Sequence, residues 1–132
     1  VEATSASVVK LGWRGHRASL PCAYLVGYLA GKHAMKRDLH SAVLDIGLRK
    51  SCKGSVLYAA AKGVVDAGVA LPVGDVLPSD ADVRGARITA YAAHLKKQSA
   101  ERYERQFGAL LKRGCDPERM ADHVEEVKAK IA

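Results

Sequence analysis

The chain has 132 residues, a formal net charge of +7 and 48% hydrophobic residues, a composition typical of one globular domain and not of a disordered segment. Its longest apolar run, Leu20 to Gly31, is shorter than the ~20 residues of a membrane-spanning helix, and no signal peptide is recognisable. Aromatic residues make up only 5% of the chain, which argues against nucleic-acid binding by base stacking.

The first third of the chain predicts a strand, a loop and a helix. Thr, Ser and Val occur at strand-like density over residues 1–11, which we interpret as an edge strand, and a loop with two glycines follows. Ser19 and Pro21 predict the N-cap and the first turn of a helix. The apolar face of this helix comprises Cys22, Leu25, Val26, Leu29 and Ala30, with the small residues Gly27 and Gly31 beside it. These glycines predict close packing on a sheet.

The centre of the chain predicts a buried strand and then a phosphate-binding loop. Residues 42–48 are apolar without alternation, which is typical of a strand buried on both faces. Leu44 and Ile46 are expected to be nearly fully buried, so that Ala at either position costs ~2–5 kcal/mol. A basic loop leads into a helix that Ser55 caps and Gly68 ends, and a short strand follows over 69–73. The packed stripe of this helix is predicted to be Leu57, Ala60, Ala61, Val64 and Val65.

The last third predicts three helices after an acidic connection that ends at Asp82. The first spans 83–97, the second is broken at Gly114, and the third starts at Asp116 and Pro117. Their predicted packed residues are Ile88, Tyr91, Ala92 and Leu95 in the first, Tyr103, Phe107, Leu110 and Leu111 in the second, and Met120, Val124, Val127 and Ile131 in the third.

The alternation of strands and helices predicts an α/β fold, a layered mixed sheet covered by helices, with strand 42–48 at its centre. We expect this α/β domain to span residues 1–98 and a helical C-terminal extension to span 99–132. The extension pairs an apolar stripe with the cations Arg102, Arg105, Lys112 and Arg113. We expect it to pack partly on the domain and partly on RNA or protein.

Positive charge is concentrated in two segments. Residues 1–55 carry nine Lys or Arg and three acidic residues, and residues 84–113 carry eight and two, so each segment has a net charge of +6. This distribution favours a polyanionic partner, although simple solubilising charge is the alternative. A cationic loop at a helix N-terminus is a typical binding site for phosphate. The predicted RNA-binding residues are Arg14, Arg17, Arg49, Lys50 and Lys53, with Ser55 orienting the helix start.

Other site chemistries have weaker support. Residues 47–55 lack the residue order and spacing of a nucleotide P-loop, and no catalytic Ser/His/Asp or Cys/His constellation is recognisable. Three cysteines and five histidines are scattered without ligand spacing, so we expect no metal, no cofactor, no disulfide and a reducing compartment. Asp45 is a conceivable ligand for a catalytic metal, which leaves a metal-dependent nuclease as the alternative function. The simpler interpretation is that loop N–H groups hold its carboxylate.

Several segments resemble, in the same order, one ribosomal protein family. They are Pro21-Cys22-Ala23-Tyr24-Leu25-Val26-Gly27-Tyr28-Leu29-Ala30-Gly31, Leu44-Asp45-Ile46-Gly47-Leu48, Gly54-Ser55-Val56-Leu57-Tyr58-Ala59, Lys62-Gly63-Val64-Val65-Asp66-Ala67-Gly68, Leu71-Pro72, and Tyr103 with Gln106-Phe107. The resemblance is to the archaeal and eukaryotic branch of the 5S-rRNA-binding large-subunit protein that is numbered eighteen in bacteria and five in eukaryotes. It covers roughly residues 12–131.

The resemblance implies a ribonuclease-H-like α/β fold without nuclease activity, and therefore not an enzyme. It implies a structural constituent of the cytoplasmic large ribosomal subunit that contacts 5S rRNA, large-subunit rRNA and neighbouring ribosomal proteins, and that helps to attach 5S rRNA in the central protuberance. The family's basic N-terminal arm and β-hairpin are absent ahead of Val1, so we expect weaker RNA binding than in a longer form. An extraribosomal adaptor that uses the helical extension is a third hypothesis.

Overall fold

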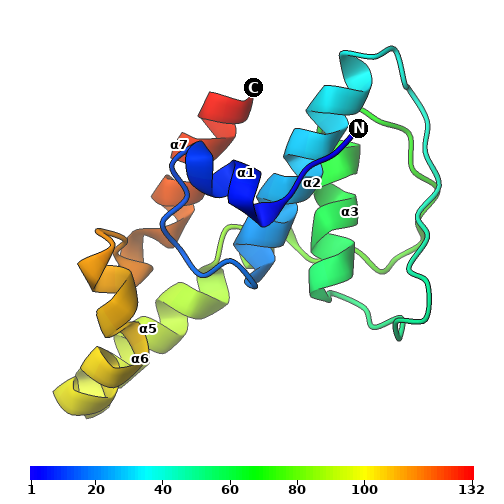
Figure 1. The fold of residues 1–132 in the computed structure, drawn as a ribbon. Helices are drawn as coiled ribbons and strands as arrows, with labels where there is room; N and C mark the ends of the chain where they lie inside the picture. The colour runs from blue at the N-terminus through cyan, green and yellow to red at the C-terminus, as the bar shows by residue number, and fades with distance from the viewer.

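Helices joined by loops make up the whole chain in the computed structural model, which describes residues 1–132 (Figure 1). In chain order, the elements are α1 (Ser5–Lys10), α2 (Leu20–Met35), α3 (Val56–Asp66), α4 (Asp80–Val83), α5 (Ala86–Gln98), α6 (Ala100–Lys112), the 3-10 turn η1 (Pro117–Arg119) and α7 (Met120–Ile131). No sheet forms, and a single parallel bridge between Ser41 and Ala70 is the only β pairing. The predicted α/β fold, a ribonuclease-H-like layered mixed sheet, is therefore wrong.

The segment predicted as the central strand lies at the surface. Residues 42–48 form neither a helix nor a strand, Val43 is 82% exposed, and Leu44 and Ile46 are only partly buried. An extended segment becomes a stable strand only when several neighbouring strands pair with it, and here the pairing is limited to one bridge. The expected burial of Leu44 and Ile46 is wrong, and a large cavity penalty for their truncation no longer follows.

The first predicted strand is also wrong, because its second half forms a helix. Thr4 is the N-cap of α1, and its hydroxyl accepts a hydrogen bond from the backbone N–H of Ser7 at 3.3 Å. Val8 on this short helix is fully buried. A segment rich in Ser and Thr is compatible with either a strand or a capped helix. Here the capping hydrogen bond of Thr4 and the burial of Val8 favour the helix.

The close approach predicted at the glycines of α2 does occur, but the partner is a helix and not a sheet. A Cβ on Gly27 would overlap the carbonyl oxygen of Ala60, and a Cβ on Gly63 would lie 2.5 Å from the backbone nitrogen of Tyr28. A Cβ on Gly31 would meet α3 later along the chain, near Val64. Contacts therefore advance in the same direction on both helices, so α2 and α3 run side by side in parallel, as Figure 1 shows.

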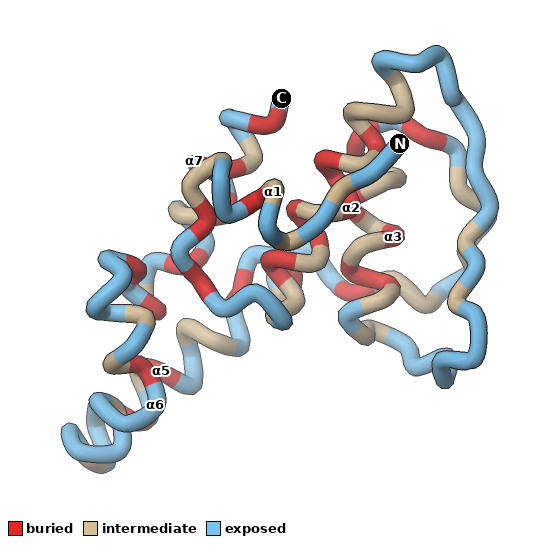
Figure 2. Tube along the Cα trace, viewed as in Figure 1, coloured by how far each residue is buried: buried red, intermediate tan, exposed pale blue.

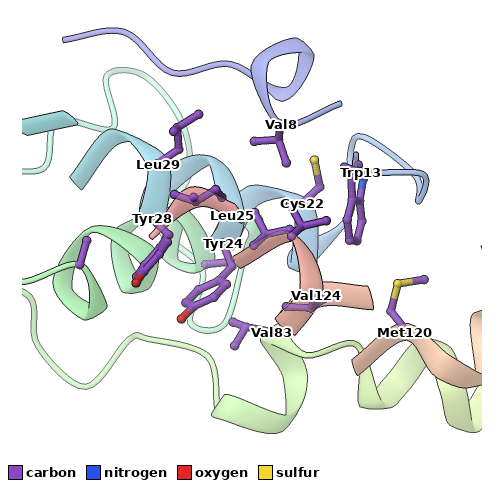
Figure 3. Packing of buried hydrophobic residues seen from close by; sticks show 14 of the residues in the cluster. Val8, Trp13, Cys22, Tyr24, Leu25, Tyr28, Leu29, Val83, Met120 and Val124 are labelled. Carbon is purple, nitrogen blue, oxygen red and sulfur yellow. The ribbon is translucent and has the colours of Figure 1, made fainter. Parts of the chain in front are cut away.

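The main hydrophobic core lies between α1, α2 and α7 (Figure 3). The predicted stripe of α7 is confirmed, since Met120, Val124, Val127 and Ile131 are all buried in it. Asp116 caps the turn before α7 by accepting a hydrogen bond from Glu118 N–H at 2.9 Å, as the sequence predicts. Helix α7 comes from the predicted extension 99–132, yet it shares this core with α2.

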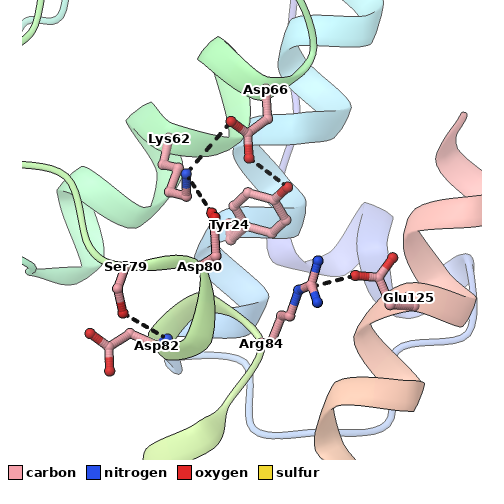
Figure 4. Close-up of polar contacts among 8 residues, drawn as sticks. All are labelled: Tyr24, Lys62, Asp66, Ser79, Asp80, Asp82, Arg84 and Glu125. Carbon is pink, nitrogen blue, oxygen red and sulfur yellow. Dashed lines mark hydrogen bonds and ion pairs between the residues drawn. The ribbon is translucent and has the colours of Figure 1, made fainter.

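A network of hydrogen bonds and ion pairs joins α2, α3 and α4 (Figure 4). The hydroxyl of Tyr24 donates to Asp66 on α3 at 2.8 Å, and Lys62 of α3 lies 2.8 Å from Asp80 of α4. Burial and the bond to Asp66 raise the pKa of Tyr24, and the hydrogen bond to Asp80 raises the pKa of Lys62. Both groups therefore hold their protons, so that the contacts between these helices persist at neutral pH.

Helices α5 and α6 form a hairpin that projects away from the α2–α3 pair (Figure 1). Ala92 and Leu95 of α5 pack against Phe107 of α6 in a small separate cluster. The outer surface of this hairpin is mostly exposed (Figure 2). Tyr91, predicted to be packed, is 50% exposed and touches Phe107 edge-on. The hairpin therefore presents much of its surface to solvent.

Candidate nucleic-acid interface

Two basic loops precede the two parallel helices and lie at the same end of the pair. The loop 12–17 leads into α2, and the loop 49–55 leads into α3. Because α2 and α3 run in the same direction, their N-termini share one end of the molecule (Figure 1). Unpaired N–H groups and the helix dipoles make that end electropositive, which adds to the charge of the loops. We call this surface the cationic end.

The loop 49–55 is exposed and anchored at several points. Arg49 and Lys50 are solvent-exposed, and the ring hydroxyl of Tyr58 on α3 shares a hydrogen bond with Ser51. Gly54 adopts a positive φ of 70°, and its N–H donates to the carbonyl of Val76 at 2.9 Å. A hollow of about 360 Å³ lies between the loop and the start of α3, lined by Arg49, Lys50, Cys52, Ser55, Val56 and Leu57.

Two details of this loop differ from the predicted arrangement. Ser55 occupies the N-cap position of α3, but its buried hydroxyl accepts no N–H of the helix and has no hydrogen-bond partner. The predicted position of Ser55 at the start of α3 is therefore confirmed, but its side chain makes no capping hydrogen bond. Lys53 forms an ion pair with Asp75 at 2.7 Å, and this pair lowers the pKa of the Asp75 carboxyl. Both groups are well exposed, so the pair is weak and easily exchanged for another anion.

The loop 12–17 places its two arginines differently. The guanidinium of Arg17 donates to the hydroxyl of Ser5 on α1 at 3.0 Å and is otherwise exposed. Arg14 is exposed, but its guanidinium reaches toward the turn after α6, within 3.2 Å of where a Cβ of Gly114 would lie. Arg17 thus contacts α1 close to the start of α2, whereas Arg14 lies between the cationic end and the turn after α6.

A loop N–H group holds the carboxylate of Asp45, as the simpler of the two interpretations of this residue predicts. Its carboxylate accepts a hydrogen bond from the N–H of Gly47 at 2.8 Å, two residues further on, and the side chain is exposed. No group of three or more His, Cys, Asp or Glu side chains is arranged to hold a metal ion. The residues around Asp45 therefore do not fit the metal-dependent nuclease alternative.

His123 of α7 is a titratable group that the sequence does not single out. Its ring stacks on Trp13 at 5.0 Å between centroids, and its Nε2 accepts the backbone N–H of Arg14 at 3.0 Å. It thereby fixes the loop 12–17 against α7. Burial lowers the pKa of His123, with Arg14 and Lys130 acting in the same direction and Glu126 against it. A contact across more than a hundred residues leaves no local signal in the sequence.

We expect the chain to lose stability as the pH falls below the ordinary histidine pKa of 6.5. The folded pKa of His123 is lower than the unfolded one, so the unfolded chain binds more protons in this range and acid favours it. The loss reaches at most about 1.4 kcal/mol per pH unit. Urea titrations at several pH values measure it, and His123→Gln is expected to flatten the dependence between pH 6.5 and the range where carboxylates titrate. An unchanged slope in His123→Gln would contradict this assignment.

Comparison with known proteins indicates the class of protein to which the chain belongs. No family model matches the chain. It is 48% identical to a protein of Ignicoccus hospitalis over 92% of its own length and 60% of that protein, and 45% identical to one of Thermofilum pendens over 98% and 66%. A protein of Methanococcus maripaludis is 43% identical over 99% of the chain and 68% of its own length. All three are named as large-subunit ribosomal proteins.

The chain belongs to the family of large ribosomal subunit protein uL18, the name that all three relatives share. It spans about three fifths to two thirds of the length of these relatives. The expected resemblance to this family is confirmed, and the expectation that the chain is not an enzyme agrees with the names of these relatives, all of which are ribosomal proteins. None of its helices has the length and apolar content needed to cross a bilayer.

Proposed function

We propose that the chain is a structural constituent of the large ribosomal subunit in the cytoplasm, where it binds 5S rRNA and helps to attach it to the large-subunit rRNA in the central protuberance. Its membership of the uL18 family and the resemblance of its motifs support this role. The observation that carries the proposal is the cationic end, where two basic loops and two helix N-termini meet. Neighbouring ribosomal proteins complete the set of partners.

The proposed mechanism is phosphate neutralisation combined with recognition of RNA shape. The contact residues are Arg14, Arg17, Arg49, Lys50 and Lys53, and Ser55 lines the hollow at the start of α3. Few aromatic side chains are available for stacking, and the major groove of A-form RNA is too narrow for side chains to read. If about four of these cations touch phosphates, the logarithm of the binding constant falls with the logarithm of salt concentration with a slope of roughly −3 to −4.

Neutralising the loop cations is expected to weaken binding to 5S rRNA about tenfold and to reduce the salt slope by about 2. The variant is Arg49→Gln/Lys50→Gln, and the matched control is Lys36→Gln/Arg37→Gln, which removes the same charge from exposed residues at the opposite end of α2. Binding is measured by filter retention of labelled 5S rRNA over a series of salt concentrations. An equal loss in both variants, or binding by the parent chain that salt does not affect, would contradict the proposed interface.

A further inference from the structure

The outward face of α6 carries positive charge that none of the interactions described so far uses. Four cations and two small or polar residues recur at intervals that place them within one arc of the helix, about 120° wide. We call this face the α6 stripe, and it consists of Arg102, Arg105, Gln106, Ala109, Lys112 and Arg113. All six residues are exposed. The opposite face holds Tyr103, Phe107 and Leu110, which pack against α5.

The charge of the α6 stripe is unbalanced. None of its cations forms an ion pair with an acidic side chain, and Glu101 and Glu104 lie outside the arc. The exposed surface of α7 differs, because Glu125 pairs with Arg84 and Glu126 pairs with Lys130. Solubilising charge is normally of mixed sign, as on α7, whereas an uncompensated row of one sign attracts an extended polyanion.

We infer that the α6 stripe is a second RNA-binding surface, which lies along the phosphate backbone of a double-helical segment of ribosomal RNA. From Arg102 to Arg113 the helix rises about 16 Å, a length over which one strand of a duplex carries roughly five phosphates. Three of the four cations are arginines, which bind phosphate oxygens with two parallel hydrogen bonds. The stripe has no large apolar side chain that could anchor a protein partner, so its chemistry favours RNA over protein.

The α6 stripe also meets the cationic end at one point. Arg113 is the C-cap of α6, and the guanidinium of Arg14 reaches the adjacent Gly114. Arg14 therefore lies where the two surfaces approach each other, and a single RNA could contact both. This inference rests on the proposed function for the identity of the RNA, but it assigns different residues on a different helix.

The test compares Arg105→Gln/Lys112→Gln with the control Lys36→Gln/Arg37→Gln and with the loop variant Arg49→Gln/Lys50→Gln. Gln is a good helix former and these positions are exposed, so the fold is retained and circular dichroism verifies it. Each variant is titrated with 5S rRNA and with a plain A-form RNA hairpin. The α6 variant is expected to bind both RNAs about tenfold more weakly than the parent chain, with a salt slope reduced by about 2.

The outcomes separate this inference from the proposed function. If the α6 variant binds both RNAs as the control does, the α6 stripe is not an RNA-binding surface, whatever the loop variant does, and an acidic protein becomes the better partner. If the α6 variant is weakened and the loop variant is not, the inference holds and the proposed interface at the loop 49–55 fails. Nuclease footprints on 5S rRNA are expected to show that the two variants lose protection at different nucleotides.

Discussion

Gly27→Ala is expected to destabilise the chain by about 3 kcal/mol or more, a large part of the 5–15 kcal/mol typical of a domain. The added Cβ would lie 2.8 Å from the Cα of Ala60 and would overlap its carbonyl oxygen. Backbone atoms of α3 cannot swing aside as a flexible side chain can, so the two helices must separate along their whole contact. The gain of ~1 kcal/mol in helix propensity from Gly to Ala offsets only part of this cost.

Gly108→Ala provides a matched control, because it is the same substitution on another helix. Nothing lies within 4 Å of a Cβ at Gly108 on α6, so this variant is expected to gain about 0.5–1 kcal/mol. Urea denaturation followed by circular dichroism measures both variants. Changes of the same sign at Gly27 and Gly108 would show that α2 and α3 do not pack through their backbones.

Removal of residues 99–132 is expected to abolish the cooperative unfolding transition of the remaining chain. The deletion takes away α7, whose four large side chains are buried against α1 and α2. At ~1.5–3 kcal/mol for each buried side chain, the free energy of unfolding falls by about 6–12 kcal/mol. This loss is as large as the stability of a whole domain. Thermal melts of the chain 1–98 test this directly, and a retained cooperative transition would show that residues 1–98 form an independent domain.

A point substitution distinguishes loss of the core from loss of chain length. Val124→Asp places a charge at a fully buried position of α7 and is expected to reproduce the effect of the deletion. Ala121→Asp introduces the same charge at an exposed position in the first turn of the same helix, where a carboxylate is tolerated. A normal melt for Val124→Asp would contradict the placement of α7 in the core.

Local signals in the sequence correctly predicted several of the helix boundaries. Ser19 caps α2, Asp116 and Pro117 start the turn before α7, and Gly68 follows the end of α3 with a φ of 106°. Each of these features depends on hydrogen bonds that span only a few residues. For that reason the residue types at neighbouring positions are enough to identify them.

Long-range pairing is where the prediction from sequence was wrong. The apolar run 42–48 shows that the segment favours an extended conformation, but it does not show which strands pair with it. Leu48 lies fully at the surface, and the predicted stripe of α3 is only partly buried, because no sheet covers it. Instead, Val65 of α3 lines an open apolar groove with Val43 and Leu71.

Part of the candidate interface could be predicted from the sequence. Net charge and the position of the basic loop ahead of α3 indicated Arg49, Lys50 and Lys53 without knowledge of the fold. The parallel arrangement of α2 and α3, which puts the second loop at the same end, depends on contacts between glycines more than thirty residues apart. The α6 stripe has a visible spacing in the sequence, but its lack of acidic partners becomes clear only once the neighbours of α6 are known.

A cleavage probe on Cys52 tests the central claim, that the cationic end faces 5S rRNA, most directly. Cys52 is exposed between Lys50 and Lys53, whereas Cys22 and Cys115 are buried and burial raises both of their pKa values, that of Cys22 to about 11, so a thiol reagent selects Cys52. A hydroxyl-radical-generating group attached there should cut bound 5S rRNA at one confined site. The control, Leu39→Cys/Cys52→Ser, carries the probe beyond the other end of α2, and it should leave that site intact. Equal cutting from both positions, or no cutting from Cys52 while the RNA is bound, would contradict the account.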